Sequence, residues 1–340
     1  MSAEPRYPFE TIGYGETLLV APGVHWLRMP LPFALDHINL YLLEDEDGWT
    51  VVDTGWNGED VRELWRAAMA GAMGGRPIRR AIVTHFHPDH LGLAGWLEAE
   101  HAVPLWMTYG EWLQAHLAWT QDVTHDAEAW MAFFRDNGLD EPSLDAYRAG
   151  LGDFGRWTSP VPRQVRRIWD GARLRIGGRD WRVIVGGGHS PEHAALYCEQ
   201  LEVLISGDQV LPRITTNISV WFTDPDGDPL RQFLESFERF RPLAAGTLVL
   251  PSHNRPFYGL GDRLDALAAH HRDRLETAFA FCTAPRTARD LVPVLFKRAL
   301  DGHQMGFAMG EALAHLNYLV ADGRLAKTRD ADGVIRYRQT

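Results

Sequence analysis

The chain has 340 residues, of which 45% are hydrophobic and 23% are charged, and its formal net charge at pH 7 is −11. This length predicts one large domain with a small second one, and it allows a sizeable core. The two cysteines, Cys198 and Cys282, are therefore expected to be free buried thiols rather than a structural disulfide. The acidic balance disfavours a protein that coats nucleic acid.

The amino terminus shows no targeting segment. Its first ten residues contain no basic stretch followed by an apolar run, and no window of the chain approaches the roughly 18 apolar residues of a membrane span. We therefore expect a cytoplasmic protein without membrane contact.

The first third of the chain alternates strand and helix patterns. Short apolar runs between residues 17 and 53 predict strands, and residues 60–73 predict a helix with one apolar face. A buried strand over 78–84 leads into a histidine-rich loop, and a helix over 91–100 and a strand over 103–107 follow. This alternation is typical of an α/β fold.

Residues 110–170 are rich in Trp, Phe and Tyr and have helical patterns, so we interpret them as a helical insertion. Strands resume between 173 and 206, then a helix is predicted over 230–240 and a short strand over 248–251.

The last 80 residues predict three helices and a β-hairpin over 325–338, which is the winged-helix pattern. Residues 262–340 hold 12 Arg or Lys against 10 Asp or Glu, a net charge of +2. This charge is weak support for binding of duplex nucleic acid. A small domain that packs on the core or mediates a homodimer is the alternative. The cations on or beside the hairpin are Arg324, Arg329, Arg336 and Arg338.

The segment 84–90, Thr-His-Phe-His-Pro-Asp-His, carries the strongest chemical signal. His85 and His87 alternate with Phe86, so their rings share one side of the chain, and Asp89 and His90 stand where the next helix begins. Imidazole and carboxylate are ligands that zinc, iron and manganese accept. Without a metal, these groups would carry a desolvation cost with nothing to offset it. The segment therefore predicts a metal site.

This segment resembles the HxHxDH motif of metallo-β-lactamase-fold hydrolases. Four other segments resemble the family's remaining motifs in order: 51–55, 188–190, 206–208 and 251–253. In the last of them, Ser252 stands where the family usually has Gly. The resemblance covers residues 15–260. It implies a four-layer αββα sandwich in a hydrolase domain over 1–260, with the insertion at about 110–170 and a winged-helix-like domain over 261–340.

The resemblance also implies a ligand set for two divalent metal ions, which we expect to be zinc, with iron or manganese as alternatives. One ion would take His85, His87 and His189, the other Asp89, His90 and His253, and Asp208 would bridge them. A hydroxide shared by the metals would attack the substrate, and Asp89 would also hold or shuttle a proton. Asp53 would support the metal loop. His193, four residues after His189, either orients a ligand or packs in the core.

The sequence supports two hypotheses about the substrate class. Asp208 argues against β-lactam hydrolysis, since true metallo-β-lactamases resemble this loop but carry Cys or Ser at the bridging position. The leading hypothesis is hydrolysis of a small or medium acyl substrate: a thioester, lactone or related ester. The aromatic insertion and the loop residues Asn217, Trp221 and Phe222 would bind its apolar part.

The alternative is an endoribonuclease-like phosphodiesterase, because that group of the family carries a similar carboxy-terminal tail. The net charge of −11 weighs against a polyanionic substrate. A basic groove formed by the hairpin arginines would nevertheless allow RNA to bind. A binding protein with a vestigial site is disfavoured, since all seven ligand positions are filled.

Overall fold

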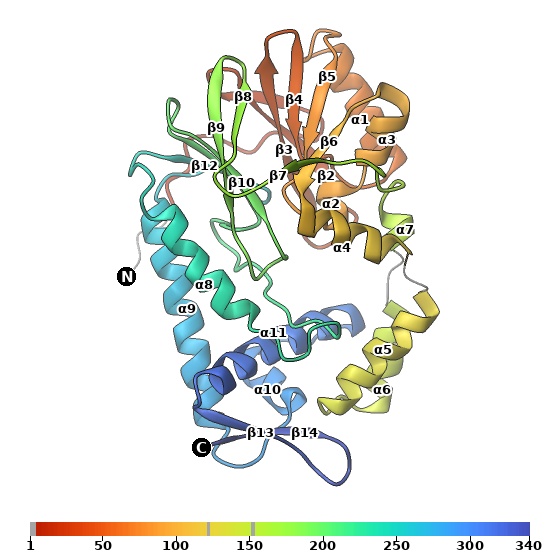
Figure 1. Cartoon of the computed structure of the whole chain (residues 1–340), viewed down its shortest axis with the longest axis vertical. Coiled ribbons are helices and arrows are strands. Elements are labelled where there is room, and N and C mark those ends of the chain that lie inside the picture. Colours follow the sequence, from red (N-terminus) through yellow and green to blue (C-terminus); the bar gives the residue numbers. More distant parts are fainter. Residues whose placement is uncertain (1–4, 121–122, 151–153) are drawn as a thin grey trace. The chain divides into compact units, whose positions relative to one another are not determined.

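The computed structural model describes residues 5–120, 123–150 and 154–340 (Figure 1). The chain packs into two compact units. The first is built from residues 1–120, 153–216 and 236–264, and the second from residues 121–152, 217–235 and 265–340. The predicted domain boundary near residue 260 stays a prediction; by packing, parts of the expected insertion belong with the carboxy-terminal helices.

The first sheet of the first unit has seven strands in sequential order. Neighbours pair antiparallel from the first strand to the fourth and parallel from the fourth to the seventh. The strands are β1 (Thr17–Ala21), β2 (Val24–Pro30), β3 (His37–Asp45), β4 (Gly48–Val52), β5 (Ile78–Ile82), β6 (Leu105–Thr108) and β7 (Arg166–Ile168). The parallel strands β4, β5 and β6 end at one edge of the sheet, which brings the segments after them together.

The strand β7 corrects the expectation that residues 110–170 are helical throughout. Arg166 pairs with Trp106 and Ile168 with Thr108 along the edge of the sheet, and Ile168 is buried. Three residues are too few to show a period of two, and the arginines that precede Ile168 hide its apolar character.

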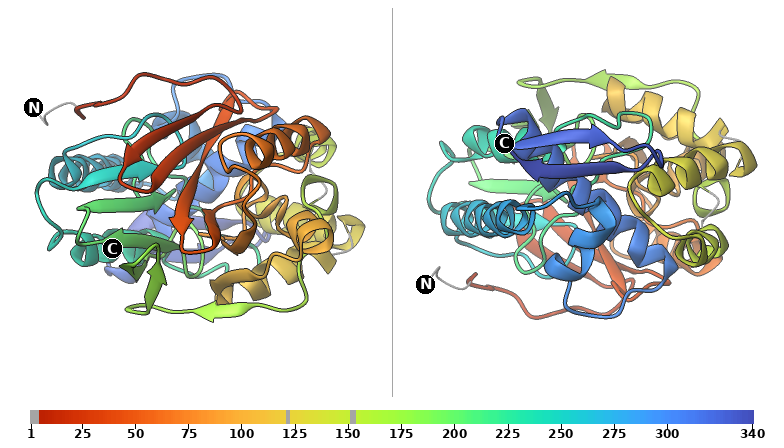
Figure 2. Two further views of the ribbon diagram at one scale, coloured as in Figure 1. Left: turned by 90° about the horizontal axis from the view of Figure 1, so that it is seen from above. Right: turned by 90° about the horizontal axis from the view of Figure 1, so that it is seen from below.

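The second sheet has five strands, in the order β12-β11-β10-β9-β8. They are β8 (Arg173–Ile176), β9 (Arg179–Val185), β10 (Ala194–Cys198), β11 (Val203–Gly207) and β12 (Leu248–Pro251). The two sheets lie face to face (Figure 2), and one core fills the space between them. Trp26 and Tyr41 enter this core from the first sheet, and Trp181 and Leu196 enter it from the second. Each such side chain contributes roughly 1.5–3 kcal/mol when buried.

Helices cover the other face of the first sheet. They are α1 (Glu59–Ala70) and α3 (Ala94–His101), and their Trp65 and Leu97 share a core with Leu40 and Val51. The four-residue α2 (Pro88–Leu91) begins with a proline, which fits the first turn of a helix because no backbone N–H is needed there. The helices α4 (Tyr109–Thr120) and α7 (Phe154–Trp157) complete the described helices that lie wholly in this unit.

The second unit contains α5 (Val123–Asp136), α6 (Glu141–Gly150), α10 (Ala288–Leu295), α11 (Gly302–Ala321), β13 (Leu325–Arg329) and β14 (Ile335–Gln339). The helices α8 (Pro229–Phe240) and α9 (Leu260–Phe281) contribute residues to both units. Close approach of α11 to α6 depends on Gly302 and Gly306, because a Cβ at either position would lie 2.3 Å from an atom of Ala146 or Tyr147. Among the described residues, no helix is both long and apolar enough to cross a bilayer.

Candidate metal centre

The histidine-rich loop follows β5 directly and is held by Asp53, the residue after β4. One carboxylate oxygen of Asp53, Oδ1, accepts hydrogen bonds from the backbone N–H of Thr84 at 2.8 Å and from its hydroxyl at 3.0 Å. Asp53 has a φ of 63°, a left-handed conformation that Asp tolerates better than most residues. The turn after β4 thus places a carboxylate under the start of the loop, and the loop projects its side chains past the sheet edge.

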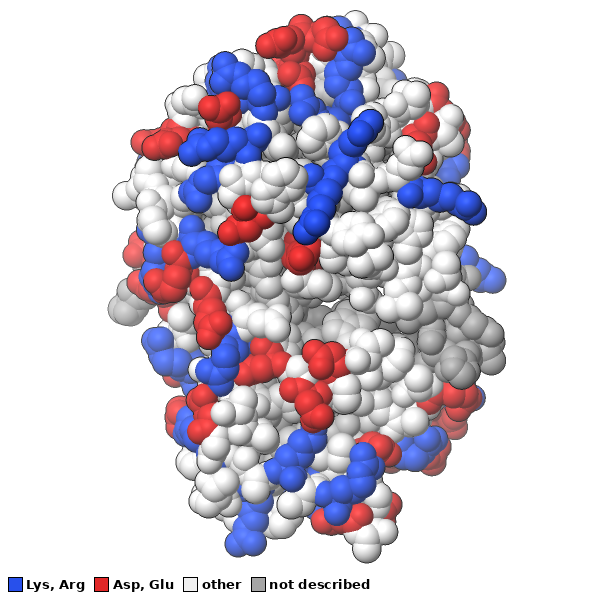
Figure 3. Space-filling model, viewed as in Figure 1, with Lys and Arg blue, Asp and Glu red and all other residues white. Residues whose placement is uncertain are grey.

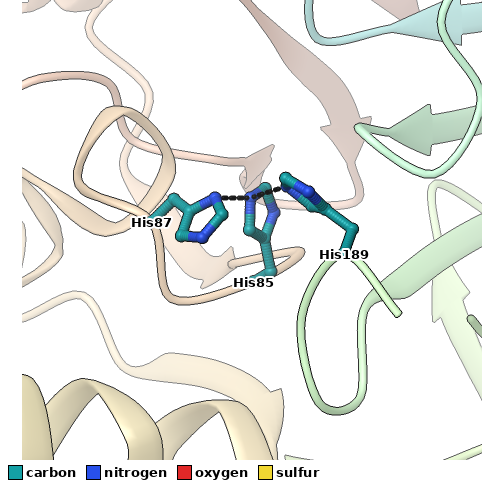
Figure 4. Close-up of side chains that lie close together, drawn as sticks. All are labelled: His85, His87 and His189. Atoms are coloured by element: carbon teal, nitrogen blue, oxygen red, sulfur yellow. Dashed lines mark hydrogen bonds between the residues drawn. The ribbon is translucent and has the colours of Figure 1, made fainter. Parts of the chain in front are cut away.

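Three imidazoles form the first candidate ligand set. Figure 4 shows the ring nitrogens of His87 and His189 turned towards that of His85. Nε2 of His85 lies 3.0 Å from Nδ1 of His87 and 3.2 Å from Nε2 of His189. Burial, followed by the neighbouring histidines, holds the pKa of His85 and of His87 well below the usual range. Both rings are therefore neutral at pH 7, and neutral imidazole is the form that binds a metal.

A second set is formed by Asp89, His90 and His253. Asp89 Oδ2 lies 3.5 Å from Nε2 of His90 and 3.5 Å from Nε2 of His253. Burial alone would lower the pKa of His90, but Asp89, Asp53 and Asp208 outweigh it and raise the pKa to about 10. These carboxylates concentrate negative charge around His90, which favours a cation as well as a proton there.

Asp208, at the end of β11, stands between the two sets. Its Oδ2 lies 3.5 Å from Nε2 of His189, and its Oδ1 lies 3.4 Å from Nε2 of His253 and 3.7 Å from Nε2 of His90. Burial would raise the pKa of Asp208, but His253 and His90 outweigh it and hold the pKa well below 3.8. The carboxylate is therefore ionised, with one oxygen turned to each set.

The donor set fits divalent cations. His90 Nε2 and Asp208 Oδ1 are buried and have no hydrogen-bond partner among the described residues. Leaving such atoms unpaired costs free energy, and a cation between them would satisfy both. Three groups have ligand atoms all within 4.8 Å of one another: His85, His87 and His189; His85, His90 and Asp208; Asp89, His90 and His253. Nitrogen and carboxylate donors in such clusters suit zinc, iron and manganese.

Both predicted supporting residues contact this centre. Asp53 Oδ2 lies 2.8 Å from Nδ1 of His90, which orients the ring so that Nε2 faces the carboxylates. His193 does not reach a ligand atom: its Nε2 accepts the backbone N–H of Asp208 at 3.1 Å. Burial lowers the pKa of His193 to about 3, so the ring is a neutral acceptor. Gly207 is required there because a Cβ would lie 2.4 Å from His193 Nε2.

Two further residues support the site, but they belong to no sequence motif and the sequence prediction did not include them. The carbonyl of His37 accepts a hydrogen bond from Nδ1 of His253 at 2.9 Å, which leaves His253 Nε2 facing Asp89 and Asp208. Glu111, on α4, is fully buried and accepts hydrogen bonds from two backbone N–H groups, of Phe86 and of Glu192. Burial raises the pKa of Glu111 to about 7. Its only signal in the sequence is an isolated carboxylate in an aromatic helix.

The three residues predicted to bind substrate lie in the second unit, whereas the candidate metal ligands lie in the first. Trp221 and Phe222 belong to an aromatic cluster with Trp130 of α5, at ring-centroid distances of 5.5 and 5.0 Å. Asn217 accepts a hydrogen bond from the hydroxyl of Ser219 at 3.2 Å. The structure therefore joins the loop and the insertion that the sequence treated separately.

Comparison with known families identifies the class. The model of the metallo-β-lactamase superfamily matches residues 34–253, and the model of the metallo-β-lactamase-like C-terminal domain matches residues 275–340. The chain therefore belongs to the metallo-β-lactamase superfamily. It is a metal-dependent hydrolase, and its His and Asp groups are candidate sites for divalent metal ions.

Particular relatives support this assignment over most of the chain. A β-lactamase domain protein from Burkholderia ambifaria is 46% identical, with a TM-score of 0.92 over 99% of this chain and 98% of that chain. A metallo-β-lactamase family protein from Thermus thermophilus is 30% identical, with a TM-score of 0.79 over 94% of this chain and 99% of that chain. A probable metallo-hydrolase of Bacillus subtilis is 24% identical over 312 residues, which cover 87% of this chain and 92% of the relative.

Proposed function

We propose that this protein is a dinuclear metallo-hydrolase of small or medium acyl substrates: a thioester, lactone or related ester. The observation that carries the two-metal proposal is the position of Asp208, whose two oxygens face two separate ligand sets. Zinc is the proposed metal, with iron and manganese as the alternatives that the same donors accept.

The residues of the site divide the work of hydrolysis. When bound, two divalent cations would supply a water of lowered pKa and polarise the carbonyl under attack. His85 and His87 stay neutral as donors, His189 completes their set, and Asp208 stays ionised between the sets. Asp89 has 20% of its side chain exposed, against 11% for Asp208, so it is the carboxylate within reach of a substrate. We assign to its carboxylate the transfer of a proton from the attacking water to the leaving group.

The charges at the carboxy-terminal hairpin favour the acyl substrate over RNA. Arg324 pairs with Glu276 at 2.8 Å and Arg329 pairs with Asp136 at 2.8 Å. Arg336 pairs with Asp330 and Asp332. On the face shown in Figure 3, acidic and basic side chains are interspersed rather than gathered in a field of one sign. Three of the four hairpin arginines are thus neutralised by carboxylates, and the charge of Arg338 that is left gives little attraction to a polyanion. This counts against the endoribonuclease-like alternative.

The aromatic cluster of Trp130, Trp221 and Phe222 is the proposed binding site for the apolar part of the acyl group. Its support is chemical: Trp221 is 36% exposed although it belongs to a large aromatic group, and ligand sites are mainly apolar. Asn217 is proposed to contribute a polar contact from the same loop.

Two finer features of the fold are also proposals. We propose a four-layer sandwich in which the end of α8 covers the second sheet, since Arg239 of α8 donates to the carbonyl of Val185 at 3.0 Å. We propose a winged-helix-like domain over 261–340, because α9, α10, α11 and the β13–β14 hairpin follow one another in that order. Its role would be to support a homodimer.

The test combines metal content with a substrate panel. Protein purified without chelator is analysed by plasma mass spectrometry, reloaded with zinc, iron or manganese, and assayed on acyl thioesters, lactones and single-stranded RNA. We expect about two metal ions per chain and turnover of an ester-type substrate. Cleavage of RNA alone would overturn the acyl hydrolase and favour the phosphodiesterase. Less than one metal ion per chain after reloading would overturn the dinuclear site.

A further inference from the structure

A buried carboxylate connects two loops that carry metal ligands. Glu111 lies in the first turn of α4, and its side chain is completely inaccessible to solvent. Its Oε2 accepts the backbone N–H of Phe86 at 3.0 Å, and its Oε1 accepts the backbone N–H of Glu192 at 2.7 Å. Phe86 stands between His85 and His87, and Glu192 stands between His189 and His193. One side chain thus holds both segments, each by a different oxygen.

A second group of hydrogen bonds joins the same two segments, this time with Glu192 as the acceptor. The carboxylate of Glu192 accepts the backbone N–H of Gly110 at 2.8 Å, and its carbonyl accepts the hydroxyl of Thr108 at 2.8 Å. A Cβ at position 110 would lie 2.9 Å from Cδ of Glu192, so glycine keeps this approach open. The start of α4 and the loop after His189 therefore clasp one another through two carboxylates. All of these residues lie in the first unit.

A carboxylate is the side chain that this position requires. The two loops present two N–H donors, and the ionised carboxylate offers an acceptor oxygen to each. Because burial raises the pKa of Glu111 to about 7, this form predominates above that pH. A glutamine has the same shape, but its NH₂ group would face one of the two donors. That backbone N–H would then be buried without an acceptor, and the loop that carries it would have to move.

We propose that Glu111 is a positioning residue that sets the separation between the His85–His87 segment and the His189 segment, and so tunes the affinity and geometry of the metal that these three imidazoles bind. This inference rests on the proposed metal centre. Its hydrogen bonds to the backbone N–H groups of Phe86 and Glu192 let Glu111 act through the backbone between the candidate ligands. A ligand nitrogen displaced by a few tenths of an ångström alters the coordination geometry, which is why such supporting contacts affect affinity.

The experiment uses Co²⁺ as the probe on the full-length chain. Affinity is measured by competition with a chromophoric chelator, and coordination geometry is read from the visible d–d absorption of the bound ion. The test variant is Glu111→Gln. The matched control is Glu311→Gln, the same change at a carboxylate of α11 that is 9% exposed and pairs with Arg274 in the second unit.

We expect Glu111→Gln to bind Co²⁺ about 10- to 100-fold more weakly, with shifted d–d bands, and Glu311→Gln to match the wild type. A merely structural role of Glu111 would lower the melting temperature of Glu111→Gln and leave its Co²⁺ affinity and d–d bands unchanged. If Glu111→Gln does not fold, Glu192→Gln serves instead, because that side chain is only half-buried and its loss weakens the same clasp.

Each outcome decides the question. A folded Glu111→Gln, or its substitute Glu192→Gln, with wild-type affinity and an unchanged spectrum overturns the positioning role and leaves the metal centre intact. A wild-type chain that binds no Co²⁺ overturns the metal centre and this inference together.

Discussion

Asp53 and His90 form a buried pair beneath the metal centre, with Asp53 Oδ2 2.8 Å from His90 Nδ1. The other oxygen of Asp53 accepts the backbone N–H of Thr84, at the beginning of the histidine loop. One carboxylate therefore sets the orientation of a ligand ring and the path of the loop that carries it. Its left-handed backbone, with a φ of 63°, places it at the turn where both contacts are within reach.

Asp53→Asn tests this orientation. Asparagine tolerates the left-handed conformation, so the fold should persist, but the amide no longer balances the charge at His90. We expect metal affinity or kcat/KM to fall about 10- to 100-fold while the melting temperature changes little. Chelator competition and initial-rate kinetics measure the two effects. Wild-type affinity together with wild-type kcat/KM would remove Asp53 from the site.

Asp208→Asn tests the bridging position. The amide keeps the shape of the side chain but loses the charge that faces His189 on one side and His253 on the other. We expect loss of at least one bound metal and a fall in kcat of roughly 10³-fold or more, since metal assistance supplies several kcal/mol of transition-state stabilisation. Metal content by mass spectrometry and kcat are compared with those of His87→Ala, which removes a ligand of the first set alone. Full activity in both variants would refute the mechanism.

The contiguous part of this site was predictable because its chemistry is local. Residues 84–90 carry four ionisable groups directly after the buried end of a strand, and a shared metal ligand accounts for that density better than a solvated histidine-rich loop does. The strands around it were equally visible, since apolar runs bounded by glycine, proline or acidic residues predict buried strands.

The supports of the site were not predictable, because their partners are backbone groups far away in the sequence. Glu111 binds the N–H of Glu192, 81 residues later, and the carbonyl of His37 binds His253, 216 residues later. A backbone group has no identity in a sequence, so no spacing rule points to it. The grouping of α6 with α11 was missed for a related reason: it depends on close contact at two glycines of α11.

A pair of buried histidines in the second unit makes stability depend on pH. His315 Nδ1 lies 2.8 Å from the carbonyl of Glu311 and donates to it, so its Nε2 accepts from Nδ1 of His271 at 3.3 Å. Burial lowers the pKa of His271 to about 2 and that of His315 to about 4. Below the unfolded pKa of about 6.5, the unfolded chain takes up protons that the folded chain cannot accept. Stability is thus fully present above pH 6.5 and falls as the pH drops towards 4.

His271→Gln should reduce this acid sensitivity. Each histidine contributes a loss of roughly 2 kcal/mol between pH 6.5 and 5, so the variant should lose about that much less than the wild type over this range. Hydrogen exchange of α11 peptides in chelator-treated protein measures the effect where it arises. His101→Gln, at an exposed histidine of α3, is the control. Identical pH dependence in the wild type and His271→Gln would contradict the prediction.

Trp221→Ala tests whether the aromatic cluster receives the acyl group. If it does, each added methylene of a substrate gains binding energy in the wild type, up to about 0.8 kcal/mol when buried, and the variant forfeits part of that gain. We expect kcat/KM to rise with acyl chain length in the wild type and to rise less steeply in Trp221→Ala, while the shortest acyl substrate is affected least. Trp169→Ala is the matched control, since Trp169 is 58% exposed on the first unit and takes no part in the cluster. Parallel dependence on chain length in all three proteins would place acyl recognition elsewhere, whereas a uniform loss with a lowered melting temperature in Trp221→Ala would mean that the ring supports the fold of the second unit only.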